Sequence, residues 1–329
     1  MDYDLLIPGN WEVVYGKDQM LRLMNDYKTH VITSNMYHEA SNKPLFPQYY
    51  ITKKNGVSIG FISYNDVEIP IRQNPGYSKG MQFTEVKANV KQLIHKLKIE
   101  EKVDVLILIA HIGISKQIAL ANHPDIEGID FIFGNDTHER IRKPIEGKFA
   151  KVVEPGAFGS FVGRLDIEVS NSKIINYTYE LVEIDPNKYR ANDKVQRIIN
   201  KKLAPYSEEM NTILGYTTTP LYRYLVVENP MDNLITDALL WKSGADFATS
   251  NGFRFGVPIL PNTPGVQAIT IRDLWRMLPV DEHMKIAEVS GQQILDWLEK
   301  EINNVYAKDP VKRFGGWLVR FSGMILKFD

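Results

Sequence analysis

The stretch Val103-Asp-Val-Leu-Ile-Leu-Ile-Ala-His-Ile-Gly113 decides the fold class of this chain. Its apolar residues run almost without interruption to Ala110, and His111 follows at once. A nearly continuous apolar run of this length is typical of a strand that is buried on both faces of a parallel sheet. We therefore expect an α/β domain in which layers of helix cover buried strands.

Short apolar segments alternate with helical ones on both sides of this strand. The pattern predicts further strands at residues 3–7, 29–33, 57–64 and 131–133, and helices at 17–27 and 83–97. Residues 148–153 and 162–168 are expected to form hairpin-type strands separated by the glycine-rich segment 155–161. Strand and helix alternation of this kind supports the α/β class.

The composition changes after residue 184. Residues 185–209 contain few large apolar side chains except those of one helical stretch, which are Val195, Ile198, Ile199 and Leu203. We interpret residues 1–184 as one domain, 185–213 as a linking helix and 214–329 as a second α+β domain, with helices near 232–242, 271–277 and 291–305. The alternative is that the linking helix is a surface helix of one large domain.

Composition also excludes several classes of function. The 329 residues carry 39 Lys and Arg against 40 Asp and Glu, so neither a nucleic-acid partner nor an anionic membrane surface is expected. There is no cysteine, which excludes disulfides and thiolate metal ligands. No apolar run is long enough for a membrane span. The first ten residues do not resemble a signal peptide and are typical of the end of a buried strand, from which we expect further chain upstream.

Three predicted strand ends carry polar groups that suit a metal site. His111 follows the strand that ends at Ala110, Asp136 and His138 follow the strand that ends at residue 133, and Asn10 follows the first strand. Open α/β sheets place ligand-handling groups at strand carboxyl ends, and an extended loop would let Asp136 and His138 reach one point. Oxygen and imidazole donors without sulfur suit Zn²⁺, Mn²⁺ or Fe²⁺. For each segment alone, a turn or cap is the simpler interpretation.

Taken in order, these segments resemble the 5′-nucleotidase family of calcineurin-like metallophosphoesterases, and within it the SoxB thiosulfohydrolase branch. The first domain contributes Pro8-Gly-Asn-Trp-Glu-Val-Val-Tyr-Gly16, Ala110-His-Ile-Gly113 and Gly134-Asn-Asp-Thr-His-Glu139. The second contributes segments 231–239, 251–256 and 315–324. The resemblance spans nearly the whole chain and depends on the order and spacing of the six segments.

The resemblance implies a first domain with α/β/β/α layers, two divalent metal ions and a C-terminal domain that holds the substrate. Asn10, His111 and Asp136 would serve one metal ion, and His138 the other. Arg254 matches the arginine that holds an anionic substrate group, a task that suits a planar guanidinium. Relatives are often periplasmic or extracellular.

The chain also departs from the family pattern. Trp11 stands where the family has a catalytic histidine, Val14 stands where it has a supporting acid, and Asp136 stands where a histidine is usual. The family's first two metal motifs lie upstream of the first residue, so we expect the first domain to lack its opening strands, and the second domain ends early. Without an imidazolium at position 11, general-acid catalysis by that residue is lost.

Three functions follow from the resemblance. The first is metal-dependent hydrolysis of a phosphomonoester such as a nucleotide, with Asn251, Phe253, Arg254, Trp317 and, more weakly, Arg223 binding the substrate. The second is SoxB-like hydrolysis of an S-thiosulfonate on a sulfur-carrier protein. The substitution at Trp11 and the contexts of Asp232, Phe253 and Arg320 favour it. The third is a catalytically silent relative that binds a ligand or a partner.

Overall fold

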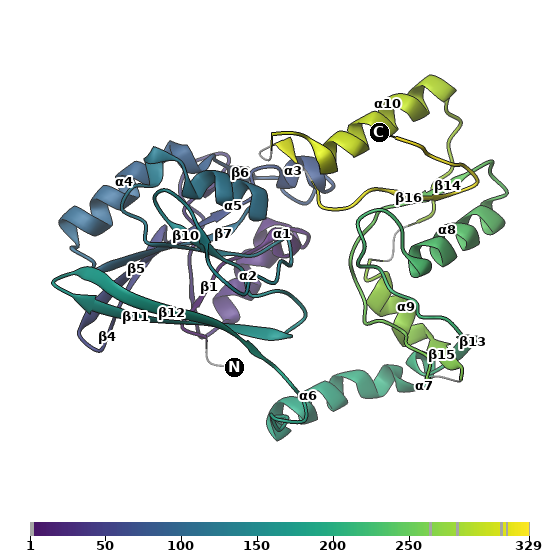
Figure 1. Cartoon of the computed structure of the whole chain (residues 1–329), viewed down its shortest axis with the longest axis horizontal. Coiled ribbons are helices and arrows are strands. Elements are labelled where there is room, and N and C mark those ends of the chain that lie inside the picture. Colours follow the sequence, from purple (N-terminus) through teal and green to yellow (C-terminus); the bar gives the residue numbers. More distant parts are fainter. Residues whose placement is uncertain (1–2, 263–264, 281–282, 310–311, 314, 329) are drawn as a thin grey trace. The chain divides into compact units, whose positions relative to one another are not determined.

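The computed structural model describes residues 3–262, 265–280, 283–309, 312–313 and 315–328. The chain divides into two compact units, Met1–Tyr189 and Arg190–Asp329, each of which is described by itself (Figure 1). The mixed α/β class expected from the sequence is confirmed. In the described residues, no helix is both long enough and apolar enough to cross a membrane.

A six-stranded sheet forms the centre of the first unit. Its strand order is β4 (Tyr49–Lys54), β5 (Val57–Asn65), β7 (Val105–His111), β8 (Phe131–Gly134), β10 (Lys151–Val153) and β9 (Ile145–Glu146). Neighbours from β5 to β10 are parallel, and the two outer strands are antiparallel to their neighbours. The apolar run from Val103 thus becomes an interior strand, with Leu106 and Leu108 completely buried.

Helices cover one face of this sheet and a β-hairpin covers the other (Figure 1). On the helical face, α4 (Val90–His95) packs its apolar side against the strands, and α5 (Ile114–Ala121) lies beside β8 and β10. On the other face, the antiparallel strands β11 (Phe161–Ser170) and β12 (Lys173–Glu183) bring Leu165, Ile167 and Val169 onto residues of β7 and β8. The unit is therefore layered as helix, sheet and second sheet.

Two expectations for this unit are wrong. The strand predicted at residues 148–153 does not form a hairpin with the one predicted at 162–168, because β10 pairs with β8 and β9 while β11 pairs with β12. The helix predicted at 83–97 begins later: β6 (Met81–Phe83) and the short helix η1 (Val86–Ala88) precede α4, and Asn89 leaves the helical region with φ −143° and ψ −2°. The helix then ends in a π-helical turn, η2 (Lys96–Glu100).

The remaining elements of the first unit are short. They are β1 (Leu5–Leu6) parallel to β2 (His30–Val31), β3 (Met36–His38) antiparallel to β6, and the helices α1 (Asn10–Val13), α2 (Lys17–Asp26), α3 (Ile69–Arg72) and η3 (Pro124–Ile126). Most of the apolar side chains of α1, α2 and β3 form a second small core with Leu45 and Phe46.

The strand register brings the carboxyl ends of β5, β7 and β8 to one edge of the sheet. Asn65 pairs with His111, and Ala110 pairs with Gly134. The loop before α1 is fixed at the same edge, because the Asn65 side chain donates a 2.9 Å hydrogen bond to the carbonyl of Pro8. The three segments singled out in the first half of the sequence are therefore neighbours.

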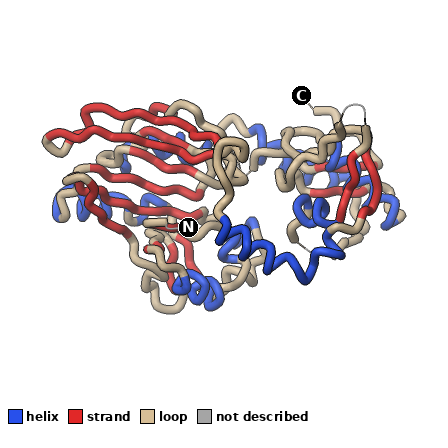
Figure 2. The backbone as a smooth tube through the Cα atoms, turned by 90° about the horizontal axis from the view of Figure 1, so that it is seen from below, coloured by secondary structure: helices blue, strands red, loops and turns tan. Residues whose placement is uncertain are grey.

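The second unit contains short paired strands and longer helices (Figure 2). Strand β13 (Ile213–Thr217) pairs with β15 (Gln267–Thr270), and β14 (Ala248–Ser250) pairs with β16 (Arg320–Ser322). Its helices are α6 (Asp193–Leu203), η4 (Ala204–Tyr206), α7 (Ser207–Met210), α8 (Pro230–Ser243), α9 (Ile271–Met277) and α10 (Gly291–Tyr306). A small apolar core joins Leu221, Met231, Ile259 and Met277.

Candidate functional site

Three side chains converge at the carboxyl edge of the large sheet. The Nε2 atom of His111 lies 3.1 Å from Oδ1 of Asn10 and 3.5 Å from Oδ1 of Asp136. His111 is the last residue of β7, Asn10 is the first residue of α1, and Asp136 follows β8 by two residues. We call these three residues the sheet-edge site. Most of the predicted metal ligands of the first domain therefore lie together.

The other ring nitrogen of His111 makes a hydrogen bond that orients the ring. Nδ1 makes a short hydrogen bond with Oδ1 of Asn135, an acceptor, so Nδ1 carries the proton. In the tautomer that is protonated on Nδ1 alone, Nε2 presents a lone pair toward the carboxylate of Asp136 and the amide oxygen of Asn10. Three electron-pair donors that face one another suit a cation between them, as in a metal site whose histidine is oriented by an outer hydrogen bond.

The donor set fits one divalent ion held by one nitrogen and two oxygens, a combination that suits Zn²⁺, Mn²⁺ or Fe²⁺. Across the described part of the chain, no group of three or more His, Cys, Asp or Glu side chains is placed to hold a metal. The site therefore depends on the Asn10 amide as its third donor, and His111, Asp136 and His138 do not form a metal-holding trio.

The loop that carries Asp136 and His138 is not extended, contrary to expectation. Both residues have positive φ, 90° for Asp136 and 63° for His138, so the loop is not extended and the side chains two apart need not share a side. The exposed ring of His138 makes an edge-to-face contact with Phe158, with 5.4 Å between ring centroids. Gly113 has φ 79°, a backbone conformation that other residues rarely adopt, and so lets the chain turn beside Asp136.

A buried carboxylate, that of Glu154, holds the loop that carries Asp136 through hydrogen bonds. Glu154 is completely buried; it accepts hydrogen bonds from the backbone N–H of Glu139 (2.8 Å), from the hydroxyl of Thr137 (3.2 Å) and from the amide of Gln117 (3.4 Å). Burial raises the pKa of Glu154 to about 7, although these three donors act in the opposite direction. Glu154 was not predicted from the sequence, where its only signal was its place after the expected strand at residues 148–153.

A network of ion pairs continues from Asp136 along the same edge. Arg72, the last residue of α3, places Nε 3.0 Å from Asp66, one terminal nitrogen 3.6 Å from Glu68 and the other 3.9 Å from Oδ2 of Asp136. Lys116 of α5 pairs with Asp66 at 3.6 Å and also with Glu68. We call these five residues the sheet-edge network. Asp66 follows β5 directly, so the strand-end rule that found His111 could have found it.

Trp11 lies next to this site, on the first turn of α1, and is 40% exposed. Its neighbour Glu12 accepts a 2.6 Å hydrogen bond from the backbone N–H of Gly9 and so holds the loop that carries Asn10. An indole donates its N–H hydrogen bond but does not release the proton near neutral pH. The residue at this position therefore contributes shape and an apolar surface rather than proton transfer.

In the second unit, three of the predicted substrate residues form an aromatic and cationic cluster. The guanidinium of Arg254 lies over the ring of Trp317 at 4.8 Å, and Phe253 meets the same ring edge-to-face at 5.8 Å. Gly252 permits this packing, because a Cβ there would lie 2.3 Å from Trp317. Asn251 is exposed and its side-chain oxygen accepts from the backbone of Phe253 at 3.3 Å. A guanidinium on an aromatic face suits a planar or anionic ligand.

Arg223 does not join that cluster. It is 1% exposed, and its guanidinium donates to Asp232 at 2.7 Å, to the carbonyl of Asn251 at 3.1 Å and to the carbonyl of Met277. Arg320 approaches the same carboxylate from the other side at 3.0 Å. We call Arg223, Asp232 and Arg320 the arginine triad. The structure gives Arg223 a place in the core of the second unit, so we leave it out of the substrate site.

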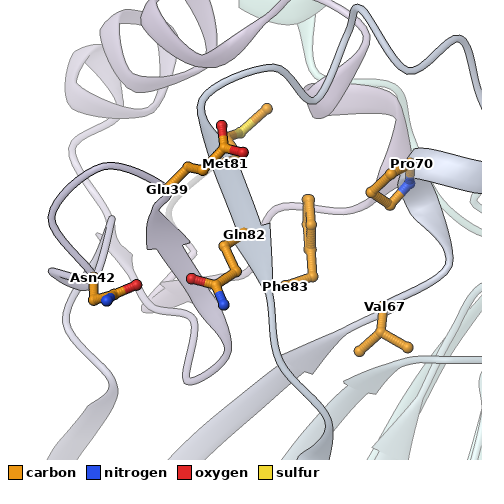
Figure 3. Close-up of a pocket in the computed structure, with 7 residues that line it drawn as sticks. All are labelled: Glu39, Asn42, Val67, Pro70, Met81, Gln82 and Phe83. Carbon is orange, nitrogen blue, oxygen red and sulfur yellow. The ribbon is translucent and has the colours of Figure 1, made fainter.

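The first unit also carries a pocket of about 490 Å³ between the α3 segment and β6, shown in Figure 3. It is lined by Val67, Pro70 and Phe83, and on its polar side by Glu39, Asn42 and Gln82. The carboxylate of Glu39 is unfavourable for a phosphate or sulfonate group. This pocket is distinct from the sheet-edge site in its residues, and we do not assign it to the substrate.

Comparison with known proteins shows what the chain is similar to. Residues 213–328 match the family model described as 5′-nucleotidase, C-terminal domain. The 5′-nucleotidase of Vibrio cholerae is 24% identical over 98% of this chain, which spans 65% of that protein's length. Among solved structures, the sulfate thiohydrolase SoxB of Thermus thermophilus matches 97% of this chain and 58% of its own with TM-score 0.87 and 23% identity. A 5′-nucleotidase precursor, also of Thermus thermophilus, matches 98% and 66% with TM-score 0.80 and 20% identity.

The fold of the chain is thus the fold shared by these two solved structures. Residues 213–328 thus match the 5′-nucleotidase C-terminal domain family, and the chain as a whole is similar to proteins named 5′-nucleotidase and, in fold, to SoxB. The family resemblance inferred from the six sequence segments is confirmed.

Proposed function

We propose that the protein hydrolyses a phosphomonoester such as a nucleotide, with one divalent ion held by Asn10, His111 and Asp136. The observation that carries this proposal is the convergence of three electron-pair donors at the carboxyl ends of parallel strands, with Nε2 of His111 lying 3.1 and 3.5 Å from the two oxygens. The similarity to proteins named 5′-nucleotidase supports the phosphoester substrate. A divalent ion there would supply a Lewis acid that activates water and offsets phosphoryl charge.

The chain's own residues prepare this site for a cation. Asn135 keeps the proton of His111 on Nδ1, so that Nε2 remains a donor toward the ion. Glu154 holds Thr137 and the backbone of Glu139, and thereby fixes the turn that presents Asp136. Because Trp11 supplies no proton, the leaving group must take its proton from water. We therefore expect esters with acidic leaving groups to react faster than nucleotides.

Recognition of the substrate is assigned to the second unit. Arg254 would pair with anionic oxygens through its planar fork, while Phe253 and Trp317 offer ring faces and edges to a base. We expect Arg254→Gln to raise the KM for AMP about tenfold with a smaller effect on kcat, since this change removes binding rather than activation.

The second candidate is hydrolysis of a cysteine S-thiosulfonate on a sulfur-carrier protein. Trp11, in place of a histidine, favours this interpretation because no imidazolium is then available to protonate an alkoxide leaving group. A terminal sulfonate would use the same guanidinium of Arg254, and a base-binding pocket would be unnecessary. The two candidates differ in the product released, which is phosphate in one case and sulfate in the other.

The test measures phosphate release from AMP and p-nitrophenyl phosphate, and sulfate release from an S-thiosulfonate peptide, with Mn²⁺ added. We expect phosphate release by the wild-type protein and at least a hundredfold loss in His111→Ala. His95→Ala removes an exposed histidine of α4 and serves as the matched control. Sulfate release alone would replace the first candidate by the second. Absence of both products from a metal-loaded protein would contradict both candidates and leave a silent ligand-binding relative.

A further inference from the structure

The sheet-edge network contains two internal cations beside the proposed ligand Asp136. Arg72 lies 3.9 Å from Oδ2 of that carboxylate, while Oδ1 faces His111 at 3.5 Å. One oxygen of Asp136 is thus directed to the proposed ion and the other to a guanidinium. We propose that Arg72 limits the sheet-edge site to a single divalent ion and weakens the binding of that ion. This inference rests on the metal ion of the proposed function.

The other carboxylates of this edge are already committed to the internal cations. Asp66 forms an ion pair with Arg72 through Oδ2, while its Oδ1 faces Lys116 and accepts a hydrogen bond from the backbone N–H of Glu68. Glu68 uses Oε2 toward both Arg72 and Lys116. A metal ion could take an oxygen from either carboxylate only by breaking these pairs. Asp66 and Glu68 are therefore withheld from metal binding, although Asp66 lies at a strand end like His111.

Charge and burial add to this effect. Three carboxylates against two cations leave the sheet-edge network with one negative charge, which one divalent ion already overcompensates. The side chains are between 4% and 31% exposed, so solvent screens their interactions less than on an open surface. Repulsion between the guanidinium and a divalent ion on the far side of Asp136 lowers the affinity for the first ion and opposes a second.

The alternative is that Arg72 only anchors α3 through Asp66 and Glu68. That role predicts lower stability for an Arg72 variant, with no gain in metal affinity. The proposal instead predicts a gain in metal affinity. Removing the guanidinium of Arg72 tightens metal binding, because it releases Asp136 and removes a repulsive charge. A variant that keeps the charge, Arg72→Lys, should resemble the wild type.

The experiment is calorimetric titration of the full chain with Mn²⁺ alone, with the Mn²⁺-induced rise in Tm as a second readout. We expect one site in the wild type, binding at least about tenfold tighter in Arg72→Gln, and wild-type affinity in Arg72→Lys. Arg164→Gln is the matched control, since Arg164 also pairs with two carboxylates, Asp166 and Glu180, on the hairpin. Lys116→Gln, expected to bind about threefold tighter, carries the test if Arg72→Gln does not fold.

Unchanged or weaker binding in Arg72→Gln, with one site in the wild type, overturns this inference and leaves the proposed function intact. Two sites in the wild type also overturn it. Binding only after Arg72 is replaced supports the repulsion by Arg72 but overturns the metal ion of the proposed function, because the wild-type protein would then hold none. Absence of binding in every variant overturns both the inference and the metal ion of the proposed function.

Discussion

Each unit of this protein contains an arginine–carboxylate network, and the two networks differ in burial and in completeness. In the arginine triad, Asp232 is completely buried and accepts from Arg223 at 2.7 Å and from Arg320 at 3.0 Å. In the sheet-edge network, Arg72 and Asp136 are 19% and 17% exposed and lie 3.9 Å apart. The arginine–carboxylate contacts are therefore short and buried in the arginine triad, whereas the Arg72–Asp136 pair of the sheet-edge network is longer and partly exposed.

The difference separates a structural role from a functional one. The triad leaves no face of Asp232 open, because Asn229 also donates to it at 2.9 Å, and Arg320 further donates to the carbonyls of Leu225 and Val226. A closed group of this kind fixes a loop and a helix in place. At the sheet edge, one oxygen of Asp136 remains directed at a histidine lone pair, which leaves a place for a cation.

The largest effect is expected from Asp232→Asn. This change leaves two buried guanidinium groups without a counter-charge, and we expect a loss of about 3 to 5 kcal/mol in the free energy of unfolding. Urea unfolding followed by tryptophan fluorescence is the measurement, since Trp241, Trp275, Trp297 and Trp317 all lie in the second unit. Asp166→Asn, in an exposed pair on the hairpin, should change stability by less than about 1 kcal/mol. Equal losses of unfolding free energy in Asp232→Asn and Asp166→Asn would contradict the expected difference between buried and exposed ion pairs.

The next effect concerns Glu154 and pH. The pKa of this carboxyl is raised from 4.5 to about 7, so between these values the folded protein keeps a proton that the unfolded chain releases. Its contribution to stability is fully present below pH 4.5 and is lost as the pH rises through 7. We expect wild type to lose about 3 kcal/mol relative to Glu154→Gln between pH 4.5 and pH 8.

Denaturant unfolding of the two proteins across that pH range measures this difference. A difference in unfolding free energy that stays constant with pH is not informative. Only the change of that difference with pH reports the titration of Glu154. Parallel stability curves would show that Glu154 titrates normally and that burial does not govern it.

A smaller effect is expected from Asn135→Ala. The hydrogen bond that Nδ1–H of His111 donates to Oδ1 of Asn135 orients the ring, and its loss should weaken Mn²⁺ binding by about 10- to 100-fold. Asn176→Ala, which removes a surface amide of β12, is the control for titration calorimetry. Unchanged affinity in Asn135→Ala would mean that the ring is oriented by the other members of the sheet-edge site.

In the first unit, the elements that could be predicted are those whose own residues indicate their secondary structure. The continuous apolar run ending at Ala110 predicted β7, and similar runs predicted β5 and β8, because strands buried on both faces carry no polar alternation. Strand pairing was not predictable in the same way. The β11–β12 hairpin did carry a local signal that was not used, because Asn171 and Ser172 form a two-residue turn with positive φ between the strands. The pairing of β10 with β8 carried none, because the two strands are separated by a loop and by β9.

The site was predictable to the extent that strand ends define it. Asn10, His111 and Asp136 follow buried strands and meet, whereas His138 required an extended loop that the positive φ values do not provide. Arg223 looked like an anion ligand by residue type, but burial among carbonyls and Asp232 decides its role. Arg72 and Lys116 were missed, because only the folded chain brings α3 and α5 to the same carboxylates.

The most direct test of a cation site at the sheet edge is the metal content of the purified chain after equilibration with Mn²⁺, measured by elemental analysis for the wild type and His111→Ala. We predict about one ion per wild-type chain and none above background in the variant, because His111 supplies the only nitrogen ligand of the sheet-edge site. Equal metal content in the two proteins, or none in either, would contradict the proposed site.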